Sequence, residues 1–570
     1  MNEAALGFLE AIQSRLVSGS LTTCSRHAAH KRLIPDIVTE EVGSFSTRYT
    51  PWSEQMMDST ASFNYAMKGA QLGVTEVLIN LAFFILDIKQ RNVLYVLPTS
   101  LIAGNFSKAR FSPALKTSPK LQEMFTDTNR ETLKVAGRAV LYITGSRGEG
   151  NLKEKPANVL LLDEIDAMDQ KAVWRALERL SGKPRDKRMV WGISTPTIPN
   201  YGIHKLYLTG TQEHYMFPCP HCEKQIELTK DNLVICGDSI TDPEIRRTHL
   251  KCVKCSKRLE HRDKPHFLKA AEWVPKNPNC DSDRRSFHVN QLYSYTIEPF
   301  EIAEAHFRGL TSEQAAQELH NSKYGIPRLG DGAKITDDLI NNCIGDYRTD
   351  TFKRPETIHE QFNTLGVDKG KICHYVVLNW RFGEFGRDLN NNATAALVDF
   401  GTFPEQDYDK RIAEIMLEWQ VRATVLDPDP GPNDARRVAK VYPGYAWLCR
   451  YREGKTGNEM SISDQVSGAP TAVVDKVNWV SNALRRFKTN RITVPQDMTD
   501  ELREHIKNPV FCYVRREKKT EAGLIVPGPM VLEYLTDGAD HYTMALTYAE
   551  IGLPLGAMNS QQAQNISEYL

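Results

Sequence analysis

The sequence has no excess of charge of either sign, no long hydrophobic run and no secretory signal. Its 71 basic and 71 acidic side chains balance, so overall charge does not indicate a nucleic-acid partner, although local basic patches remain compatible with one. The longest apolar run, Val77 to Ile88, is interrupted by Asn80 and Asp87. It is too short to span a bilayer and suits a buried helix. The N-terminal segment lacks the apolar core of a signal peptide.

Composition otherwise describes an ordinary globular protein. The hydrophobic content is 41% and the charged content is 25%. A length of 570 residues suits two or three domains. Eleven cysteines, several in CxxC pairs, indicate thiols and metal ligation in the cytoplasm rather than a disulfide framework.

One short apolar run ends on two adjacent carboxylates. Residues 159–162 (VLLL) suit a strand buried on both faces of a parallel sheet, and Asp163 and Glu164 follow directly. Ligands of open α/β sheets bind at the carboxyl ends of the strands. One acid there can hold magnesium, and its neighbour can polarise a water for attack on a phosphate. The alternative is a strand followed by a solvated acidic turn.

A glycine-containing turn earlier in the chain has the features of a phosphate loop whose lysine is displaced. In the pattern G-x-x-x-x-G-K-[ST], backbone amides surround the phosphates, a lysine contacts them and a hydroxyl binds magnesium. Gly73 and Thr75 fit this spacing, but Val74 takes the lysine position. Lys68, followed by Gly69, stands where the first glycine should be, so its ammonium could reach the phosphates from the other end of the loop.

The order of segments favours a phosphate loop over a plain turn before a core helix. Strands expected at 93–97 and 139–143 lie between this loop and the strand that ends on Asp163. A phosphate-loop ATPase has this arrangement.

Two further segments could serve a nucleotide. Trp52 could stack on an adenine that Gln55 hydrogen-bonds, although a helix start capped by Ser53 explains the same residues equally well. The loop GISTPT ends a strand in small hydroxyl residues. This loop could sense the γ-phosphate and pass hydrolysis to a neighbouring domain.

Two CxxC pairs predict a zinc ribbon. Tetrahedral Zn²⁺ prefers four thiolates, and each pair supplies two from one turn; the expected ligands are Cys219, Cys222, Cys252 and Cys255. A redox CxxC would normally occur once, at a helix start. His221 is expected to be a spacer and Cys236 a bystander. The surrounding basic residues could contact nucleic-acid phosphate, and a purely structural clip is the alternative.

Three aspartates after residue 360 predict a second acidic site. Asp368 lies on an expected strand, Asp427 ends another, and Asp540 opens an expected helix. In a ribonuclease-H-like fold they would converge and hold two metal ions about 4 Å apart, which clamp a phosphodiester. Asp540 could instead be a helix N-cap.

Two of these assignments have close competitors in the sequence. Asp399 and Asp429 compete with Asp427, and Asp537 competes with Asp540.

Taken together, KGAQLGVTE, LLLDEID, GISTPT, CPHC, CVKC, GVDKG and DGADHY resemble the large terminase subunit of tailed bacteriophages, in its GpA-type family. The resemblance covers roughly residues 50–552. It implies an α/β chain: an N-terminal RecA-like (ASCE) P-loop ATPase domain with a zinc-ribbon insertion, and a C-terminal ribonuclease-H-like nuclease domain. The ATPase would move double-stranded DNA into a procapsid, and the nuclease would cut the concatemer.

The resemblance also implies a role for each site residue. Lys68, Gly69, Gly73, Thr75, Gln55 and Asp163 would bind ATP with its magnesium, Glu164 would be the catalytic base, Ser194, Thr195 and Thr197 would form the coupling loop, and Asp368, Asp427 and Asp540 would hold Mg²⁺ or Mn²⁺ in the nuclease. Arg110 and Arg147 are both candidates for an arginine finger.

The expected organisation follows the same order. It comprises an arm at 1–45, an ATPase core at 46–210, the zinc ribbon at 211–265, the rest of the ATPase domain and a linker at 266–360, the nuclease at 361–555 and a flexible tail at 556–570. The arm would contact a small terminase subunit and the tail the portal protein of the procapsid. We expect a homo-oligomer on the portal and a location in the bacterial host cytoplasm, with no membrane contact and no place in the mature virion.

Two other classes of protein compete with this interpretation. A helicase-like DNA-dependent ATPase without nuclease activity would need a second RecA-like half, and the sequence has no second phosphate-loop-like segment after residue 360. A non-enzymatic zinc-ribbon assembly protein would leave the carboxylates at two strand ends unexplained.

Overall fold

The computed structural model describes residues 21–567 except 126–127, 147–154, 179, 181, 331–333, 354–360, 383–392, 453–459, 464–468, 520–524 and 537. The chain divides into two compact units, Met1–Gly330 with Tyr513–Val531, and Asp331–Cys512 with Leu532–Leu570. The first unit is therefore discontinuous in sequence. The second unit begins earlier than the expected boundary at 361, because Ile344 already pairs with Val494 of that unit.

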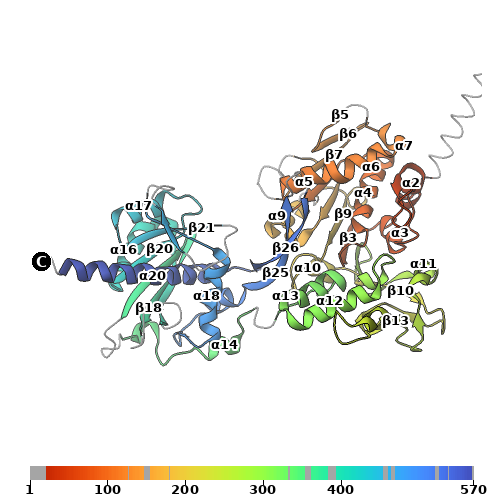
Figure 1. Cartoon of the computed structure of the whole chain (residues 1–570). Helices are drawn as coiled ribbons and strands as arrows, with labels where there is room; N and C mark the ends of the chain where they lie inside the picture. The colour runs from red at the N-terminus through yellow and green to blue at the C-terminus, as the bar shows by residue number, and fades with distance from the viewer. Residues whose placement is uncertain are drawn as a thin grey trace, which may run out of the picture. The chain divides into compact units, whose positions relative to one another are not determined.

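A parallel sheet forms the centre of the first unit (Figure 1). In spatial order its six central strands are β16 (Arg284–Val289), β3 (Phe63–Lys68), β9 (Met189–Ser194), β8 (Val159–Asp163), β4 (Val93–Leu97) and β7 (Ala139–Gly145). They are mostly buried, and two of them, β8 and β4, are apolar and buried on both faces, as a parallel sheet covered by helices requires. All five neighbouring pairs are parallel, so their carboxyl ends share one edge. This is the expected RecA-like arrangement.

Both edges of this sheet are extended. Beyond β7 lie the antiparallel β6 (Leu133–Ala136) and β5 (Thr128–Asn129). Beyond β16 lie β10 (Glu213–Pro218), β11 (Gln225–Ile226) and β15 (Glu272–Pro275). The cysteine-containing segment follows β10 directly, and its own small sheet is β12 (Leu233–Val234), β13 (His249–Lys251) and β14 (Arg258–Leu259). It is therefore an insertion that starts and ends in the main sheet.

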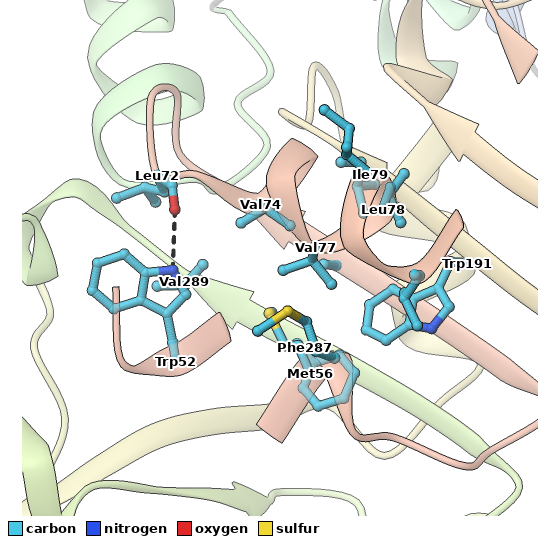
Figure 2. Close-up of a cluster of buried hydrophobic side chains, with 14 of the residues drawn as sticks. Trp52, Met56, Leu72, Val74, Val77, Leu78, Ile79, Trp191, Phe287 and Val289 are labelled. Carbon is cyan, nitrogen blue, oxygen red and sulfur yellow. Dashed lines mark hydrogen bonds between the residues drawn. The ribbon is translucent and has the colours of Figure 1, made fainter. Parts of the chain in front are cut away.

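The helix behind the expected phosphate loop is packed on both sides. Figure 2 shows Val74 and Val77 of α4 (Val74–Phe84) facing Trp52 and Met56 of α3 (Trp52–Met57), with β16 beneath them. All of these side chains are buried. The run of apolar residues predicted to be a buried helix is this one, and it continues as the π-helical turn η1 (Ile85–Lys89).

Other helices of the first unit flank the sheet and the connector. They are α2 (Cys24–Lys31), α5 (Ser100–Phe106), α9 (Gln170–Glu178), α10 (Gly202–Leu208), α12 (Pro299–Thr311) and α13 (Glu313–Glu318), the last continuing into η10 (Leu319–Lys323). Helix α2 packs against α4. Part of the expected N-terminal arm is therefore built into the first unit.

The second unit contains a mixed sheet. Its order is β22 (Ser461–Ser463), β23 (Thr471–Val474), β21 (Ala446–Tyr451), β20 (Val421–Leu426), β17 (Gln361–Asp368), β18 (Ile372–Arg381), β19 (Thr394–Pro404) and β24 (Ile492–Thr493). Strands β17, β18 and β19 form an antiparallel meander, and β20 and β21 run parallel to β17. This order and these directions match the expected ribonuclease-H-like fold.

Helices cover both faces of this second sheet. One face packs against α18 (Lys476–Lys488), α19 (Asp500–Lys507) and α20 (His541–Ser567), and the other against α16 (Tyr408–Glu418) and α17 (Asn433–Val441). Helix α20 lies close to β17 because residue 366 is glycine: a Cβ there would lie 2.0 Å from the carbonyl oxygen of Ala545. Helix α20 continues to Ser567, through most of the segment expected to be a flexible tail.

Two paired strands contain most of Tyr513–Val531, the late segment of the chain that belongs to the first unit. Strands β25 (Val510–Lys519) and β26 (Ile525–Leu535) pair with each other. The backbone amide of Tyr513 donates to Gln317 Oε1 of the first unit, at 2.9 Å. Among the described helices, none combines the length and the apolar character needed to cross a membrane.

Candidate functional sites

The displaced lysine reaches the carboxyl ends of two neighbouring strands. Lys68 ends β3, and its Nζ lies 3.2 Å from Glu164 Oε1 and 3.5 Å from Thr195 Oγ1. Its side chain is buried, whereas that of Glu164 is 45% exposed. The three residues lie at one edge because β3, β9 and β8 are adjacent and parallel. The structure therefore brings together the predicted lysine, base and coupling loop.

The loop after Lys68 is held tightly from outside. A Cβ on Gly69 would lie 3.0 Å from the carbonyl oxygen of Ser322, so only glycine fits there without movement. Gln291 Nε2 donates to the carbonyl oxygen of Ala70 at 2.8 Å. Gly73 adopts a left-handed conformation (φ 71°) as N-cap of α4, and Thr75 lies in the first helical turn. A helix N-terminus behind a glycine turn can bind phosphate.

Asp163 is buried, with one carboxylate oxygen hydrogen-bonded and the other without a partner among the described residues. The hydroxyl of Tyr95 donates to Oδ2 at 2.8 Å, and the oxygen without a described partner is Oδ1. Burial, and then the negative charge of Glu164, raise the pKa of Asp163 to about 6. A bound magnesium ion would satisfy the buried oxygen and favour the ionised carboxylate.

A second aspartate in the same turn was not anticipated as a site residue. Asp166 is buried and accepts hydrogen bonds from Thr197 N (2.8 Å), Thr197 Oγ1 (2.8 Å) and Ile203 N (2.7 Å). Its own amide donates to Ser194 Oγ at 3.1 Å. Asp166 thus ties the acidic turn to the coupling loop. Gly202 is needed beside it, because a Cβ there would lie 2.3 Å from Asp166 Oδ1.

The structure does not support the expectation that Trp52 stacks on an adenine. Trp52 is 1% exposed, and its Nε1 donates to the carbonyl oxygen of Leu72 at 3.1 Å (Figure 2), so its ring is a core side chain and is not available to stack on a base. The alternative is also wrong, because the N-cap of α3 is Pro51 and Ser53 lies inside the helix. The amide group of Gln55 bonds the backbone of Ala271 and Trp273, so its contact with a base stays a prediction.

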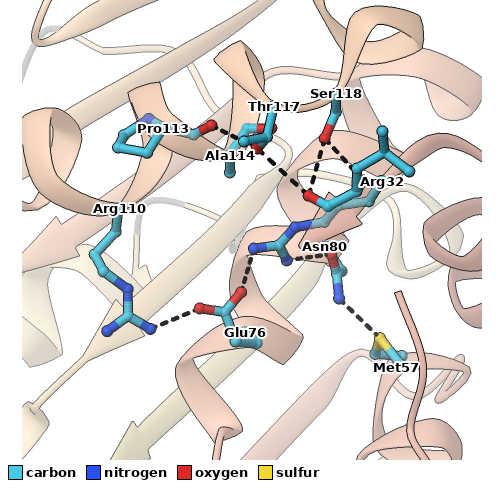
Figure 3. Close-up of polar contacts among 10 residues, drawn as sticks. Arg32, Met57, Glu76, Asn80, Arg110, Pro113, Ala114, Thr117 and Ser118 are labelled. Carbon is cyan, nitrogen blue, oxygen red and sulfur yellow. Dashed lines mark hydrogen bonds and ion pairs between the residues drawn. The ribbon is translucent and has the colours of Figure 1, made fainter. Parts of the chain in front are cut away.

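A charged network surrounds the start of α4 (Figure 3). Glu76, next to Thr75, accepts from the buried Arg32 and, at 2.6 Å, from Arg110 Nη2. Arg32 Nη1 also donates to Asn80 Oδ1 at 2.5 Å. Burial acts to raise the pKa of Glu76, but the two guanidinium charges outweigh it and lower that pKa. Arg110 therefore lies beside the loop helix, and its role as an arginine finger stays a prediction.

The other arginine-finger candidate, Arg147, lies outside the described residues.

The four cysteines of the two CxxC pairs meet. Their sulfurs all lie within 4.8 Å of one another, with Cys219–Cys255 at 3.9 Å and Cys222–Cys252 at 4.0 Å. Zn–S bonds of about 2.3 Å in a tetrahedron place sulfurs roughly 3.8 Å apart. The geometry therefore suits Zn²⁺.

Each cysteine turn also orients a backbone amide toward a sulfur. His221 N donates to Cys219 Sγ (3.5 Å), and Lys254 N donates to Cys252 Sγ (3.3 Å). The ring of His221 bonds the carbonyl oxygen of Arg258 instead of joining the four sulfurs, which agrees with its expected role as a spacer. Cys236 is not part of the cluster.

In the second unit, two of the predicted acids lie side by side. Asp368 ends β17, and Asp427 follows the end of the parallel neighbour β20. Asp427 N donates to the carbonyl oxygen of Val367 at 3.0 Å. Burial, together with the negative charges of Asp368 and Asp429, raises the pKa of Asp427 to about 7. A cation bound beside Asp427 would offset this repulsion and favour its ionised form.

The competitors are placed differently. Asp399 is bonded by Trp419 Nε1 (2.9 Å), by the hydroxyl of Tyr375 (3.3 Å) and by the amide of Phe400 (2.8 Å), so its oxygens are already engaged. Asp429 contributes its backbone amide to Asp427 Oδ1 at 3.0 Å. These contacts favour Asp427 as the second acid.

The third predicted acid is engaged by a tyrosine. Asp540 Oδ2 accepts a hydrogen bond from the hydroxyl of Tyr534. Its neighbour His541, the first residue of α20, contacts Asp368 Oδ2 through Nδ1 at 2.8 Å. Asp537 lies outside the described residues.

Histidines next to the acids were missed by sequence reasoning. His374 lies directly opposite Asp368 in the β17–β18 pair, and His505 of α19 completes the group around His541. Their positions at 374, 505 and 541 share no local motif. The only available sequence signal was the histidine next to Asp540 in DGADHY.

A buried lysine at the end of one strand, close to a glutamate that follows a nearby parallel strand, is the arrangement expected of a phosphate-loop ATPase domain. Residues 39–273 match the family described as phage terminase large subunit gpA, ATPase domain. This segment, which is less than half of the chain, is therefore similar to the ATPase domain of that family.

Two terminase large subunits align with part of this chain. The chain is 28% identical over 174 residues to the terminase large subunit of Enterobacteria phage P21, and 27% identical over 175 residues to that of Escherichia phage lambda. Each alignment covers 28% of this chain and 27% of the relative, so the chain spans about a quarter of the length of these relatives. Among solved structures, the HK97 bacteriophage large terminase aligns at 11% identity over 94% of this chain and 99% of that chain, with a TM-score of 0.46.

Proposed function

We propose that this protein is the large subunit of a viral DNA-packaging motor. ATP hydrolysis in the first unit drives double-stranded DNA into a procapsid, and a two-metal nuclease in the second unit cuts concatemeric DNA. The observation that carries the ATPase half is the contact of Lys68 with Glu164 and Thr195 at the carboxyl edge of the sheet. The gpA family match over residues 39–273 supports the same half.

The residues divide the chemistry of hydrolysis between them. Lys68 and the N-terminus of α4 would bind the phosphates, Thr75 and Asp163 would hold Mg²⁺, and Glu164 would orient and deprotonate the attacking water. Loss of the γ-phosphate would be sensed at Thr195, which contacts Lys68. Asp166 would then carry the change to α10 through its bonds to Thr197 and Ile203.

The nuclease half rests on the adjacent acids Asp368 and Asp427. Mg²⁺ or Mn²⁺ held between them would polarise the scissile phosphate and activate water. Asp540, at the start of α20, is the proposed third acid. A helicase-like ATPase without nuclease activity is the second candidate, but it gives no reason for two acids at neighbouring strand ends in a ribonuclease-H-like sheet.

Zn²⁺ is the proposed ion of the four-cysteine site. Its contribution there would be structural, because four thiolates leave no open position for a substrate. The packaging partners are proposed as well: double-stranded DNA, a small terminase subunit, the portal protein and further copies of this chain on the portal. The work would take place in the host cytoplasm.

Plasmid cleavage tests the proposal directly. Wild-type protein with Mn²⁺ or Mg²⁺ should cut a plasmid, and Asp368→Asn should abolish cutting while ATP turnover continues. Asp346→Asn, an acid elsewhere in the same unit, serves as the control and should cut normally. ATP turnover by wild-type protein without any cleavage in either metal would favour the helicase-like alternative.

A further inference from the structure

The histidines beside Asp368 form a compact group on three elements. His374 comes from β18, His505 from α19 and His541 from α20. The rings of His374 and His541 stack, with centroids 4.7 Å apart and an interplanar angle of 17°. His505 lies 5.6 Å from His374 and 5.7 Å from His541. The carboxylate chemistry proposed above does not require any of these imidazoles.

One buried ring nitrogen in the group has no hydrogen-bond partner among the described residues. This atom is Nδ1 of His374, a residue that is 6% exposed. Its other nitrogen, Nε2, lies 3.6 Å from Glu501 Oε1. A buried polar atom without a hydrogen-bond partner is unfavourable, so such an atom in a native site calls for a ligand or a role.

The ligand atoms are close enough to share one ion. One donor atom each from Asp368, His374 and His541 lies within 4.8 Å of the other two. Metal bonds of about 2.1 Å hold opposite ligands up to roughly 4.2 Å apart, so only small adjustments are needed. Asp368 and His374 are fixed by the strand pairing in which they are direct partners. The third ligand, His541, already contacts Asp368.

We propose that Asp368, His374 and His541 bind one divalent transition-metal ion, and that Mn²⁺ fills this position in preference to Mg²⁺. This inference rests on the nuclease function proposed above. Two imidazoles and one carboxylate suit ions of the first transition row, whereas Mg²⁺ prefers an all-oxygen, partly hydrated shell. The position at Asp427 has oxygen donors. The two metal positions of the nuclease therefore differ in the ion that they select.

Metal binding by the full-length, zinc-loaded protein tests this proposal. The probe is Mn²⁺ alone, with free Mn²⁺ followed by electron paramagnetic resonance and Mg²⁺ added as competitor. The variants are His541→Ala, whose side chain is 48% exposed and whose removal spares the core, and His374→Gln. His306→Ala, a histidine of α12 in the first unit, is the matched control.

Wild type should prefer Mn²⁺ over Mg²⁺, and either cluster variant should lose roughly tenfold or more of its Mn²⁺ affinity. Mg²⁺ affinity should change much less, and the control should match wild type. Unchanged Mn²⁺ affinity in a folded His541→Ala protein, or equal losses for both ions, would overturn the proposal and leave His541 as a hydrogen-bond partner that orients Asp368. A protein that selects Mn²⁺ through His541 but never cuts DNA would support the metal site and remove the nuclease function.

Discussion

Three carboxylates at the edge of the first sheet differ in their surroundings, and the roles proposed for them follow from these differences. Asp163 is buried against Tyr95, Glu164 is half exposed beside Lys68, and Asp166 is enclosed by backbone amides. Of the three, only Glu164 is open to water, and for this reason it is the proposed base. Asp163 is suited to a cation, and Asp166 to holding two loops together.

Replacement of the exposed acid should separate binding from turnover. Glu164→Gln should bind ATP with unchanged affinity to within about twofold and lose at least 100-fold in kcat, because the amide cannot accept the proton of water. Nucleotide binding and phosphate release measured on the same preparation check this. Asp169→Asn, an exposed acid in the next turn, should turn over normally. Substantial hydrolysis by Glu164→Gln would remove this residue from the role of base.

The enclosed acid should make local stability depend on pH. Burial raises the pKa of Asp166 to about 7 in the folded protein, above its ordinary value of 3.8. Between these values the unfolded chain binds fewer protons than the folded one, so stability should fall as pH rises from 5 to 7 and level off above 7. Relative to Asp166→Asn, the change should be about 1–3 kcal/mol.

Hydrogen exchange of the β8 and β9 amides at several pH values measures the difference in local stability between wild type and Asp166→Asn. A gap between wild type and Asp166→Asn that stays constant with pH would contradict the raised pKa.

At the level of elements, the sequence predicted the strands that run as short apolar segments. The strands around Val93, Ala139 and Val159 were all expected, because uninterrupted apolar runs have few alternatives in a parallel sheet. Local patterns could not show that α2 packs on α4, since the contacts between them join residues far apart in sequence, such as Arg32 at the end of α2 and Glu76, 44 positions away. The same limit hid His374 and His541. They meet Asp368 only through the pairing of β17 with β18 and the start of α20.

The close packing of α20 on β17 should be sensitive to one methyl group. In Gly366→Ala the new Cβ would overlap the backbone of Ala545, so the helix must shift at a cost of about 1–3 kcal/mol. Thermal unfolding should show a lowered transition, and cleavage should fall because α20 carries His541. Gly43→Ala, where a Cβ meets nothing within 4 Å, is the control. A variant as stable as the control would mean that α20 is not packed this closely.

At the scale of the whole molecule, two units carry separate cores and separate sites. The cysteine cluster belongs to the core of the first unit, whose hydrophobic cluster includes Cys219 and Cys252. The proposed nuclease acids and the histidines beside them lie in the second unit: Asp368, Asp427, Asp540, His374, His505 and His541. Damage confined to one unit should therefore leave the chemistry of the other measurable.

Removal of metal from the cysteines should test this separation. The purified protein should contain about one zinc ion per chain. A chelator that removes zinc from the cysteines should lower the unfolding temperature of the first unit and the ATPase rate. Cleavage, measured after Mn²⁺ is restored, should persist. Cys236→Ser should behave as wild type, because this thiol is outside the cluster. Metal-free protein with unchanged stability would contradict the zinc site.

The chain returns to its first unit after completing most of the second, since Tyr513 to Val531 are grouped with residues before 331 and the amide of Tyr513 bonds Gln317. The gene therefore cannot be cut once to give two intact halves. An ATPase fragment that stops at residue 330 would lack a stretch that belongs to it, and a nuclease fragment that starts there would carry that stretch as an orphan. Because the two units alternate along the chain, exchange of either unit between related genes would need three crossovers, after residues 330, 512 and 531.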